Sequence, residues 1–227
     1  MNGMIKGPQG WLLAPEAAAV FPAEHTAVIA DVHLGYEWAR AQGGDCLPAH
    51  SLRETLTLLE SLIARAAITR LVVAGDMVES RIPCSRTARD LAALSRWLDE
   101  RGVELIALQG NHDPPRSPSL PSTLDVGGWT VSHGHRPLLA VRNISGHHHP
   151  MLRASGVSAP CFLVDDATII LPAFSPNAAG ASLASLGPAL SHSHPNRALR
   201  CIATAGGTLL DFGLISTLIH NARLVVT

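Results

Sequence analysis

Three short apolar runs, separated by helix-patterned segments, constrain the fold of this chain more than any other feature. Residues 26–30, 70–74 and 104–108 are nearly continuous apolar runs, as expected of strands buried on both faces of a sheet. Between them, residues 49–66 and 86–101 place leucines at helical spacing. This strand–helix alternation, followed by mostly strand-like segments, predicts a mixed α/β sandwich.

The second half of the chain is dominated by shorter strand-like segments. They span residues 129–132, 143–145, 159–164, 168–171, 199–204 and 207–212. Residues 175–198 are rich in Ala, Ser, Pro and Gly, and we expect a long flexible loop there. The length of 227 residues suits a single domain over 1–227.

Composition restricts the classes of function. Apolar residues make up 47% and charged residues 15%, which indicates a globular chain with a core. The formal net charge of −1 argues against a protein that holds long nucleic acid by bulk positive charge. No apolar run approaches a membrane span, and the four cysteines form no CxxC pair. We therefore expect a cytoplasmic protein without a membrane partner.

The chain contains 12 histidines but only one tyrosine, and histidine is the commonest metal ligand. Many of them lie in polar blocks directly after predicted strands. The blocks are Asp31-Val32-His33, Gly75-Asp76, Gly110-Asn111-His112-Asp113, Ser132-His133-Gly134-His135 and Gly146-His147-His148-His149. Because open α/β sheets bind ligands at the carboxyl ends of their strands, we expect all five blocks to meet at one site. In an extended segment, Asp31 and His33 would share a face, as would His147 and His149.

The blocks contain more metal-ligand side chains than one ion needs. The seven oxygen and nitrogen donors are Asp31, His33, Asp76, Asn111, His133, His147 and His149. They fit two divalent ions that share a carboxylate, and the lack of thiolates suits Mn, with Fe or Zn as alternatives. Two such ions can polarise a phosphoryl group and activate a water molecule. They also attract phosphate without a basic protein surface.

This five-block pattern resembles the calcineurin-like metallophosphoesterase superfamily over about residues 26–150. The resemblance implies a four-layer α/β/β/α sandwich with mixed sheets. It also implies a division of the ligands between the metals. Asp31, His33, Asp76 and His149 would hold one ion, and Asn111, His133 and His147 the other, with Asp76 as the bridge.

The same resemblance implies catalytic roles for two further residues. His112 would contact the phosphate and protonate the leaving oxygen, and Asp113 would orient His112. One departure is Glu79, where many members carry Asp or His. His135, Arg116 and Arg136 lie close to the blocks and are candidate substrate contacts.

A narrower resemblance involves the segments outside the blocks. The strand at residues 11–14, the Leu171-Pro172-Ala173-Phe174 segment and the closing hairpin are similar to ligase-associated DNA damage response endonucleases and their archaeal phosphoesterase relatives. This implies a DNA-repair nuclease that cleaves phosphodiester bonds, with single-stranded DNA as a substrate and a DNA ligase and helicase as partners.

Two other functions remain open. One is a phosphatase or phosphodiesterase for a small nucleotide-like substrate. The other is a non-catalytic, metal-stabilised module that docks onto a ligase or helicase. With 4% aromatic residues, the chain offers few platforms on which bases could stack, and Trp38 and Phe174 are the candidates.

Overall fold

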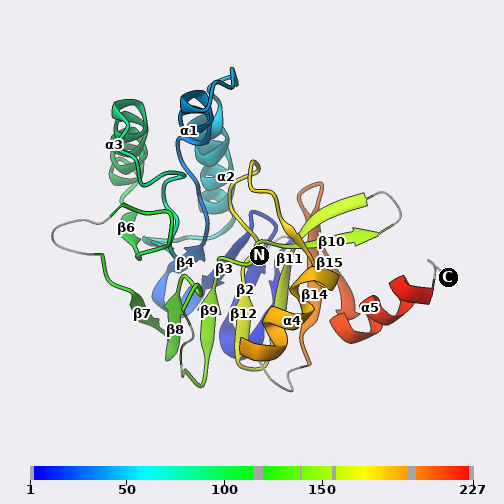
Figure 1. Ribbon diagram of the computed structural model, residues 1–227. Coiled ribbons are helices and arrows are strands. Elements are labelled where there is room, and N and C mark those ends of the chain that lie inside the picture. Colours follow the sequence, from blue (N-terminus) through cyan, green and yellow to red (C-terminus); the bar gives the residue numbers. More distant parts are fainter. Residues whose placement is uncertain are drawn as a thin grey trace.

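Two β-sheets pack face to face, and helices cover the outer face of each (Figure 1). The structure is a computed structural model that describes residues 3–114, 120–136, 138, 140–154, 157–193 and 198–224. The layer order is the α/β/β/α arrangement that the family resemblance implied, so the predicted fold class is confirmed.

The first sheet has six strands in the order of the sequence. They are β1 (Ile5–Lys6), β2 (Leu12–Ala14), β3 (Ala18–Phe21), β4 (Thr26–Ile29), β5 (Arg70–Val73) and β6 (Glu104–Ala107). The first four are antiparallel neighbours, whereas β4, β5 and β6 are parallel. The three parallel strands therefore end at the same edge of the sheet.

Three helices lie in the connections between the parallel strands, α1 (Tyr36–Gln42), α2 (Ser51–Arg65) and α3 (Ser85–Asp99). Helices α2 and α3 cover the outer face of the first sheet. Leu59 and Leu62 of α2 and Leu94 and Leu98 of α3 are fully buried against β4 and β5. Their spacing of three or four residues explains why the leucine pattern predicted both helices.

The second sheet carries the remaining strands. They are β7 (Thr123–Val126), β8 (Trp129–Ser132), β9 (Asn143–Ser145), β10 (Pro150–Ala154), β11 (Val157–Asp165), β12 (Thr168–Ile170), β13 (Ala181–Ser182), β14 (Arg200–Ala205) and β15 (Thr208–Leu214). Strands β8, β9 and β12 are parallel neighbours. The carboxyl ends of β8 and β9 thus also lie at one edge, where they meet the segments that leave the first sheet.

The prediction of a long loop over residues 175–198 is wrong for much of its length. Strand β13 and helix α4 (Leu183–Ser193) lie within it, and α4 covers the outer face of the second sheet together with α5 (Ile215–Leu224). Leu183, Leu186 and Leu190 of α4 are buried beside Cys161 and Leu163 of β11. The small residues around these leucines obscured their helical spacing in the sequence. No helix in the described ranges is long and apolar enough to cross a membrane.

Large aromatic side chains fill the space between the sheets. Trp11 precedes β2 and is fully buried, with its ring centroid 6.2 Å from that of Trp129 on β8. Phe162 of β11 and Val28 of β4 belong to the same apolar cluster. This packing fixes one sheet against the other and sets the relative positions of their strand ends.

The Leu171-Pro172-Ala173-Phe174 segment ties this core to the strand ends. The N–H of Phe174 donates to the carbonyl of Ala30 at 2.8 Å, and that of Ser175 donates to the carbonyl of Asp31 at 3.1 Å. The Phe174 ring is only 2% exposed and packs among the leucines of the first sheet's outer core. Phe174 is therefore a core residue, and the expectation that it stacks on a base is wrong.

We expect Phe174→Ala to lower the free energy of unfolding by about 3–5 kcal/mol, because a buried ring is replaced by a cavity. Urea unfolding followed by circular dichroism measures the change. Phe212→Ala is the matched control, since Phe212 is 44% exposed on β15 and should lose far less. Equal stability of Phe174→Ala and the wild type would contradict this role.

Candidate metal centre

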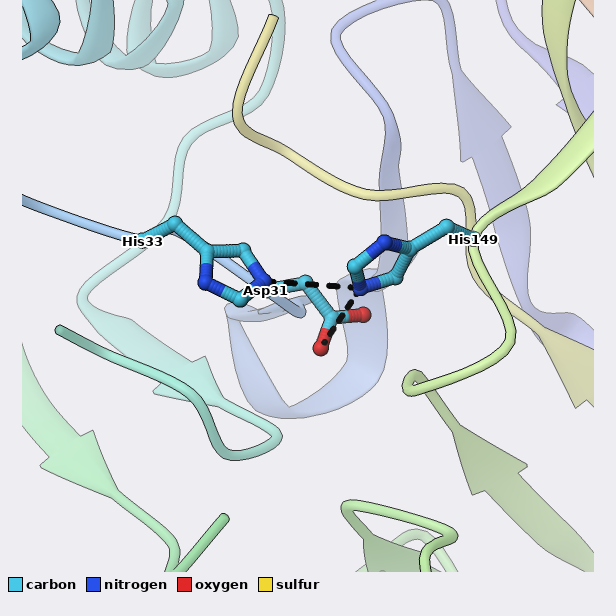
Figure 2. Close-up of side chains that lie close together, drawn as sticks. All are labelled: Asp31, His33 and His149. Carbon is cyan, nitrogen blue, oxygen red and sulfur yellow. Dashed lines mark hydrogen bonds and ion pairs between the residues drawn. The ribbon is translucent and has the colours of Figure 1, made fainter. Parts of the chain in front are cut away.

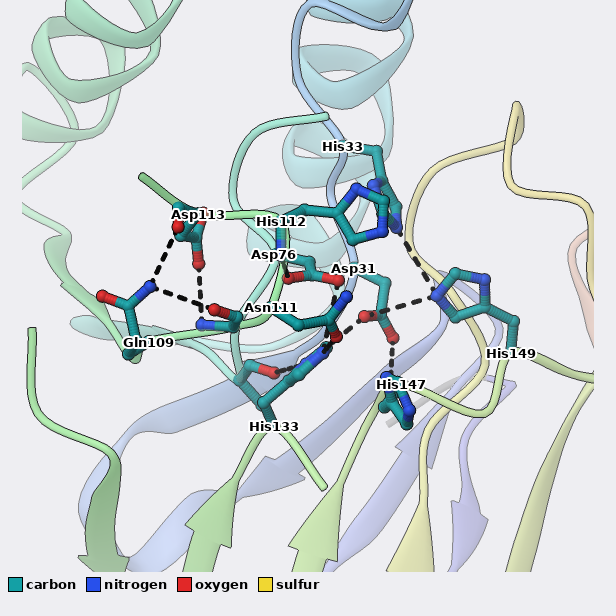
Figure 3. Close-up of polar contacts among 12 residues, drawn as sticks. Asp31, His33, Asp76, Gln109, Asn111, His112, Asp113, His133, His147 and His149 are labelled. Carbon is teal, nitrogen blue, oxygen red and sulfur yellow. Dashed lines mark hydrogen bonds and ion pairs between the residues drawn. The ribbon is translucent and has the colours of Figure 1, made fainter. Parts of the chain in front are cut away.

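The segments that follow five strands converge on one site (Figure 3). Asp31 and His33 follow β4, Asp76 follows β5, and Asn111 and His112 follow β6. His133 comes directly after β8, and His147 and His149 come after β9. The structure thus brings together all five polar blocks, two of them from a different sheet than the other three.

Left-handed backbone conformations shape these segments. The φ angles are 58° for Asp31, 49° for His33, 51° for Asp76, 68° for His147 and 42° for His149. The segments are therefore not extended, and the expectation that strand pleating aligns Asp31 with His33 is wrong. Asp and His tolerate this region better than most residues, although each such position still costs roughly 1–3 kcal/mol. The strained backbone at these five residues directs their side chains toward one site.

Asp31, His33 and His149 form a first cluster of facing donor atoms (Figure 2). Nε2 of His33 lies 3.5 Å from Nε2 of His149, which in turn lies 3.3 Å from Oδ1 of Asp31. That oxygen is buried and has no hydrogen-bond partner in the described part of the chain. An unsatisfied carboxylate oxygen facing two imidazole nitrogens is well suited to a divalent cation.

Asp76, Asn111 and His133 form a second cluster beside the first. Nδ1 of His133 lies 3.1 Å from the carbonyl of Ala74, to which it can donate. Nε2 of His133 then faces Oδ1 of Asn111 at 2.8 Å and Oδ2 of Asp76 at 3.2 Å. In the neutral ring these three atoms are all acceptors, so the cluster also fits a cation.

The two clusters are linked through their carboxylates. Ligand atoms of Asp31, Asp76 and His133 all lie within 4.8 Å of one another, so either carboxylate is close to both clusters. His147 contacts the site through its backbone, since its N–H donates to Oδ2 of Asp31 at 2.9 Å. Its ring lies 5.0 Å from that of His133, and it belongs to none of the compact ligand groups found among the described residues.

Asp76 and His133 shift each other's pKa. Burial alone would raise the pKa of Asp76, but the hydrogen bond and charge of His133 and the N–H of His112 lower it to about 2. Burial would lower the pKa of His133, but its contacts with Asp76 and Asp31 raise it. The pKa of His147 falls to about 4, through burial and the charge of His133. In the metal-free protein, the proton between the Asp76 carboxylate and the His133 ring is therefore held by His133.

A backbone carbonyl, and not Asp113, orients His112. Nδ1 of His112 lies 2.7 Å from the carbonyl oxygen of Glu79. The Asp113 carboxylate instead accepts from the backbone N–H groups of Gly110 at 2.9 Å and Val78 at 3.2 Å. Asp113 was expected to orient His112, and its contacts show that any such effect acts through the loop and not through a hydrogen bond to the ring. Asp113 is 1% exposed and braces the loop that carries His112.

Glu79 contacts a second imidazole through its side chain. Oε2 of Glu79 lies 2.9 Å from Nδ1 of His33, on the side of the ring opposite Nε2, the nitrogen that faces His149. Carboxylate contacts of this kind fix the orientation of a ligand ring and raise its basicity. From the sequence, Glu79 stood out only as a departure from the family pattern, three residues after Asp76. The sequence did not indicate that its side chain contacts His33.

Two glycines leave room for the carboxylates. A Cβ atom at Gly110 would collide with the Asp76 side chain and backbone, and one at Gly146 would collide with Asp31 and the Cβ of Ala30. Close approach of the backbone to each carboxylate therefore accounts for these two glycines.

The candidate substrate contacts lie beside the second cluster. The ring of His135 is 5.1 Å from that of His133, and its Nδ1 is buried without a hydrogen-bond partner among the described residues. Arg136 is exposed next to it. Arg116 lies outside the described residues.

Comparison with known proteins agrees with this geometry. A family model for calcineurin-like phosphoesterases matches residues 25–158. Over 146 residues, or 63% of the chain, the sequence is 25% identical to the DNA double-strand break repair protein Mre11 of Archaeoglobus fulgidus. The match spans about 30% of that relative's length.

A solved structure is similar over nearly the whole chain. The crystal structure of Pseudomonas putida nuclease MPE aligns with a TM-score of 0.66 at 24% identity. The alignment covers 91% of this chain and 98% of the other. At this identity, the likeness establishes the fold.

We expect Glu79→Ala to weaken metal binding by roughly 10–100-fold, because the ring of His33 loses the carboxylate that orients it. Isothermal titration with Mn²⁺ measures the affinity. Glu100→Ala, at an exposed residue after α3, is the control. An unchanged affinity in Glu79→Ala would show that this contact does not support the site.

Metal affinity should fall as the pH is lowered through the raised pKa of His133, because a protonated ring cannot bind a cation. For one proton, the loss is about tenfold per pH unit below that pKa. Asp76, with a pKa of about 2, stays ionised and adds nothing to this slope. Titrations between about pH 8 and pH 6, in buffers of different ionisation enthalpy, count the protons released. A constant affinity without proton release would contradict the assignment.

Proposed function

The chain belongs to the calcineurin-like phosphoesterase family, and from this membership we propose that it is a dinuclear-metal phosphodiesterase that acts as a DNA-repair nuclease. Membership makes it a metal-dependent phosphoesterase. The diester substrate, the second metal ion and the role in repair are the parts that we propose.

The single observation that carries the proposal is the pair of adjoining donor clusters beside His112. Ligand atoms of His33, Asp76 and His112 lie within 4.8 Å of one another, so His112 is at the edge of both clusters. The buried, unpartnered Oδ1 of Asp31 supports occupancy of the first cluster by a cation. We favour Mn²⁺, since carboxylate, amide and imidazole donors suit it.

Two bound divalent ions would supply electrophilic stabilisation of the phosphoryl group and an activated water. His112 would then transfer a proton to the leaving oxygen. The carbonyl of Glu79 holds the Nδ1–H of His112, so Nε2 is the nitrogen that carries the transferred proton. Asp113 keeps this loop in place through Gly110 and Val78.

The proposal of a nucleic-acid substrate is supported by the two similar proteins, which are a DNA double-strand break repair protein and a nuclease. Single-stranded DNA as a substrate and a DNA ligase and helicase as partners extend that proposal. We also propose a cytoplasmic location, because the four cysteines are free, as in a reducing compartment.

A small nucleotide-like phosphoester is the second candidate substrate. The net charge of −1 argues against binding of a long nucleic acid by bulk positive charge, and Phe174 is buried. The ring of Trp38 is occupied as well, because the Arg86 guanidinium lies 4.9 Å above it. Few aromatic faces are therefore free to stack on a nucleic-acid chain.

The experiment assays the metal-loaded protein on p-nitrophenyl phosphate, bis-p-nitrophenyl phosphate and a single-stranded oligonucleotide. We expect hydrolysis of both diesters with Mn²⁺. Activity on the monoester alone would exclude the nuclease, and activity on bis-p-nitrophenyl phosphate without cleavage of DNA would favour the small substrate. No turnover with Mn²⁺, Fe²⁺ or Zn²⁺ would favour a non-catalytic module.

In the same assay, His112→Ala should lower kcat by roughly 10²–10⁴-fold, since it removes the general acid. The metal content measured by elemental analysis should remain that of the wild type. His220→Ala, at an exposed position on α5, is the matched control. Loss of metal together with activity would instead make His112 a ligand.

A further inference from the structure

An apolar pocket borders the loops that carry and orient His112. Its volume is about 340 Å³, which lies in the range of pockets that bind small organic groups. Its walls come from the loop after β5, from the first two turns of α3 and from the residue that follows Asp113. The apolar residues that line it are Val78, Ile82, Pro83, Ala88, Leu91 and Pro114.

The loop after β5 separates this pocket from the metal centre. The Glu79 carboxylate contacts His33, whereas Val78 and Ser80, on either side of Glu79, line the pocket. The carbonyl of Glu79 lies 2.7 Å from Nδ1 of His112. One segment of chain thus divides the pocket from the site, and neighbouring extended segments are only about 5 Å apart.

The mouth of the pocket offers apolar surface to the solvent. Ile82 is 62% exposed, and Pro83 and Ala88 are exposed as well. The Ser80 hydroxyl accepts from the backbone N–H of Ile82 at 3.1 Å, which holds the turn that presents Ile82. An apolar surface of this kind, directly beside a polar site, suits the apolar part of a molecule whose polar part lies in the site.

We propose that this pocket binds the base of the nucleoside that leaves when the phosphodiester is cleaved. This inference rests on the proposed function and narrows its substrate from phosphodiesters in general to nucleotides. A base has two apolar faces and a polar edge. The faces suit the apolar walls, and the edge suits the hydroxyl groups of Ser80, Ser85 and Thr87, which also line the pocket.

The contacts of His112 indicate which nucleoside reaches the pocket. His112 donates its proton to the leaving oxygen, so the leaving nucleoside lies next to this ring. The ring is held by the carbonyl of Glu79, whose neighbour Ser80 lines the pocket. The sugar of the leaving nucleoside links that oxygen to the base, and it would cross the single segment of chain between site and pocket. In an in-line displacement, the attacking water lies on the opposite side of the phosphate.

The kinetic test compares three dinucleoside monophosphates with the Mn²⁺-loaded protein. One has both bases, and in each of the others one of the two nucleosides lacks its base. The products identify the leaving nucleoside, because the phosphate stays with its partner. We expect removal of the leaving base to lower kcat/KM roughly tenfold, the effect of losing the burial of an apolar group of side-chain size. Removal of the other base should have a much smaller effect.

Two variants alter the pocket without changing a metal ligand. Ala88→Leu fills the pocket and should abolish the preference for the leaving base. Ile82→Ala removes part of the wall and should lower the preference roughly threefold. Both residues are exposed, so circular dichroism should show an unchanged fold. Val141→Ala is the matched control, because Val141 is 84% exposed before β9, at the end of that strand opposite the site.

A binding test does not depend on turnover. The methyl resonance of Ile82 is followed by NMR in isotope-labelled protein freed of metal by EDTA, and Ile82→Ala assigns it. The dinucleotide with both bases should shift this resonance through the ring current of the base. The dinucleotide without the leaving base should leave it in place. Ile169 on β12, which is fully buried between the sheets, is the internal reference.

The outcomes separate the base pocket from the proposed function. Equal effects of removing either base would overturn the pocket, as would a preference that both variants retain. An Ile82 resonance that the complete dinucleotide leaves unchanged would overturn it as well. If the wild type hydrolyses no diester, the proposed function fails, and the Ile82 resonance alone decides whether the pocket holds a base.

Discussion

The buried carboxylate of Asp31 is the interaction on which the centre of the molecule depends. Asp31 leaves β4 of the first sheet, yet its Oδ2 accepts from the backbone N–H of His147, which follows β9 of the second sheet. Its Oδ1 faces His149 and His133, also from the second sheet. One fully buried side chain therefore joins the two sheets at their shared edge. A buried carboxylate is costly without cationic partners, so the stability of this junction and the binding of metal are coupled.

Much of this arrangement could be predicted from the order of residues. Buried parallel strands have a distinctive apolar pattern, and the polar residue after each of β4, β5 and β6 reaches the same edge for topological reasons. Helix α4 was not predictable in the same way. Its leucines are separated by Ala, Ser, Gly and Pro, and they become recognisable as a helix face only where they pack on the apolar outer face of β11 and β14.

The contacts around His112 show which information a sequence lacks. A neighbouring acidic residue, Asp113, was the obvious partner, but its carboxylate binds backbone N–H groups of two loops. The actual partner is a backbone carbonyl, which every residue possesses and no pattern reveals. Glu79 is therefore tied to the site by two different parts of the same residue, its carbonyl to His112 and its carboxylate to His33. Such a link depends on the path of the loop after β5 and not on the residue type alone.

The left-handed backbone at Asp31, His33, Asp76, His147 and His149 also restricts how the site can change during evolution. A substitution at any of these positions must tolerate a positive φ angle as well as provide a suitable ligand atom. β-Branched residues do not tolerate a positive φ angle. The accessible replacements are Asn, Asp, His and Gly, most of which are again small or polar. A lineage that lost catalysis would therefore retain a polar, glycine-rich edge rather than fill it with apolar side chains. The shape of the site would thus outlast its activity.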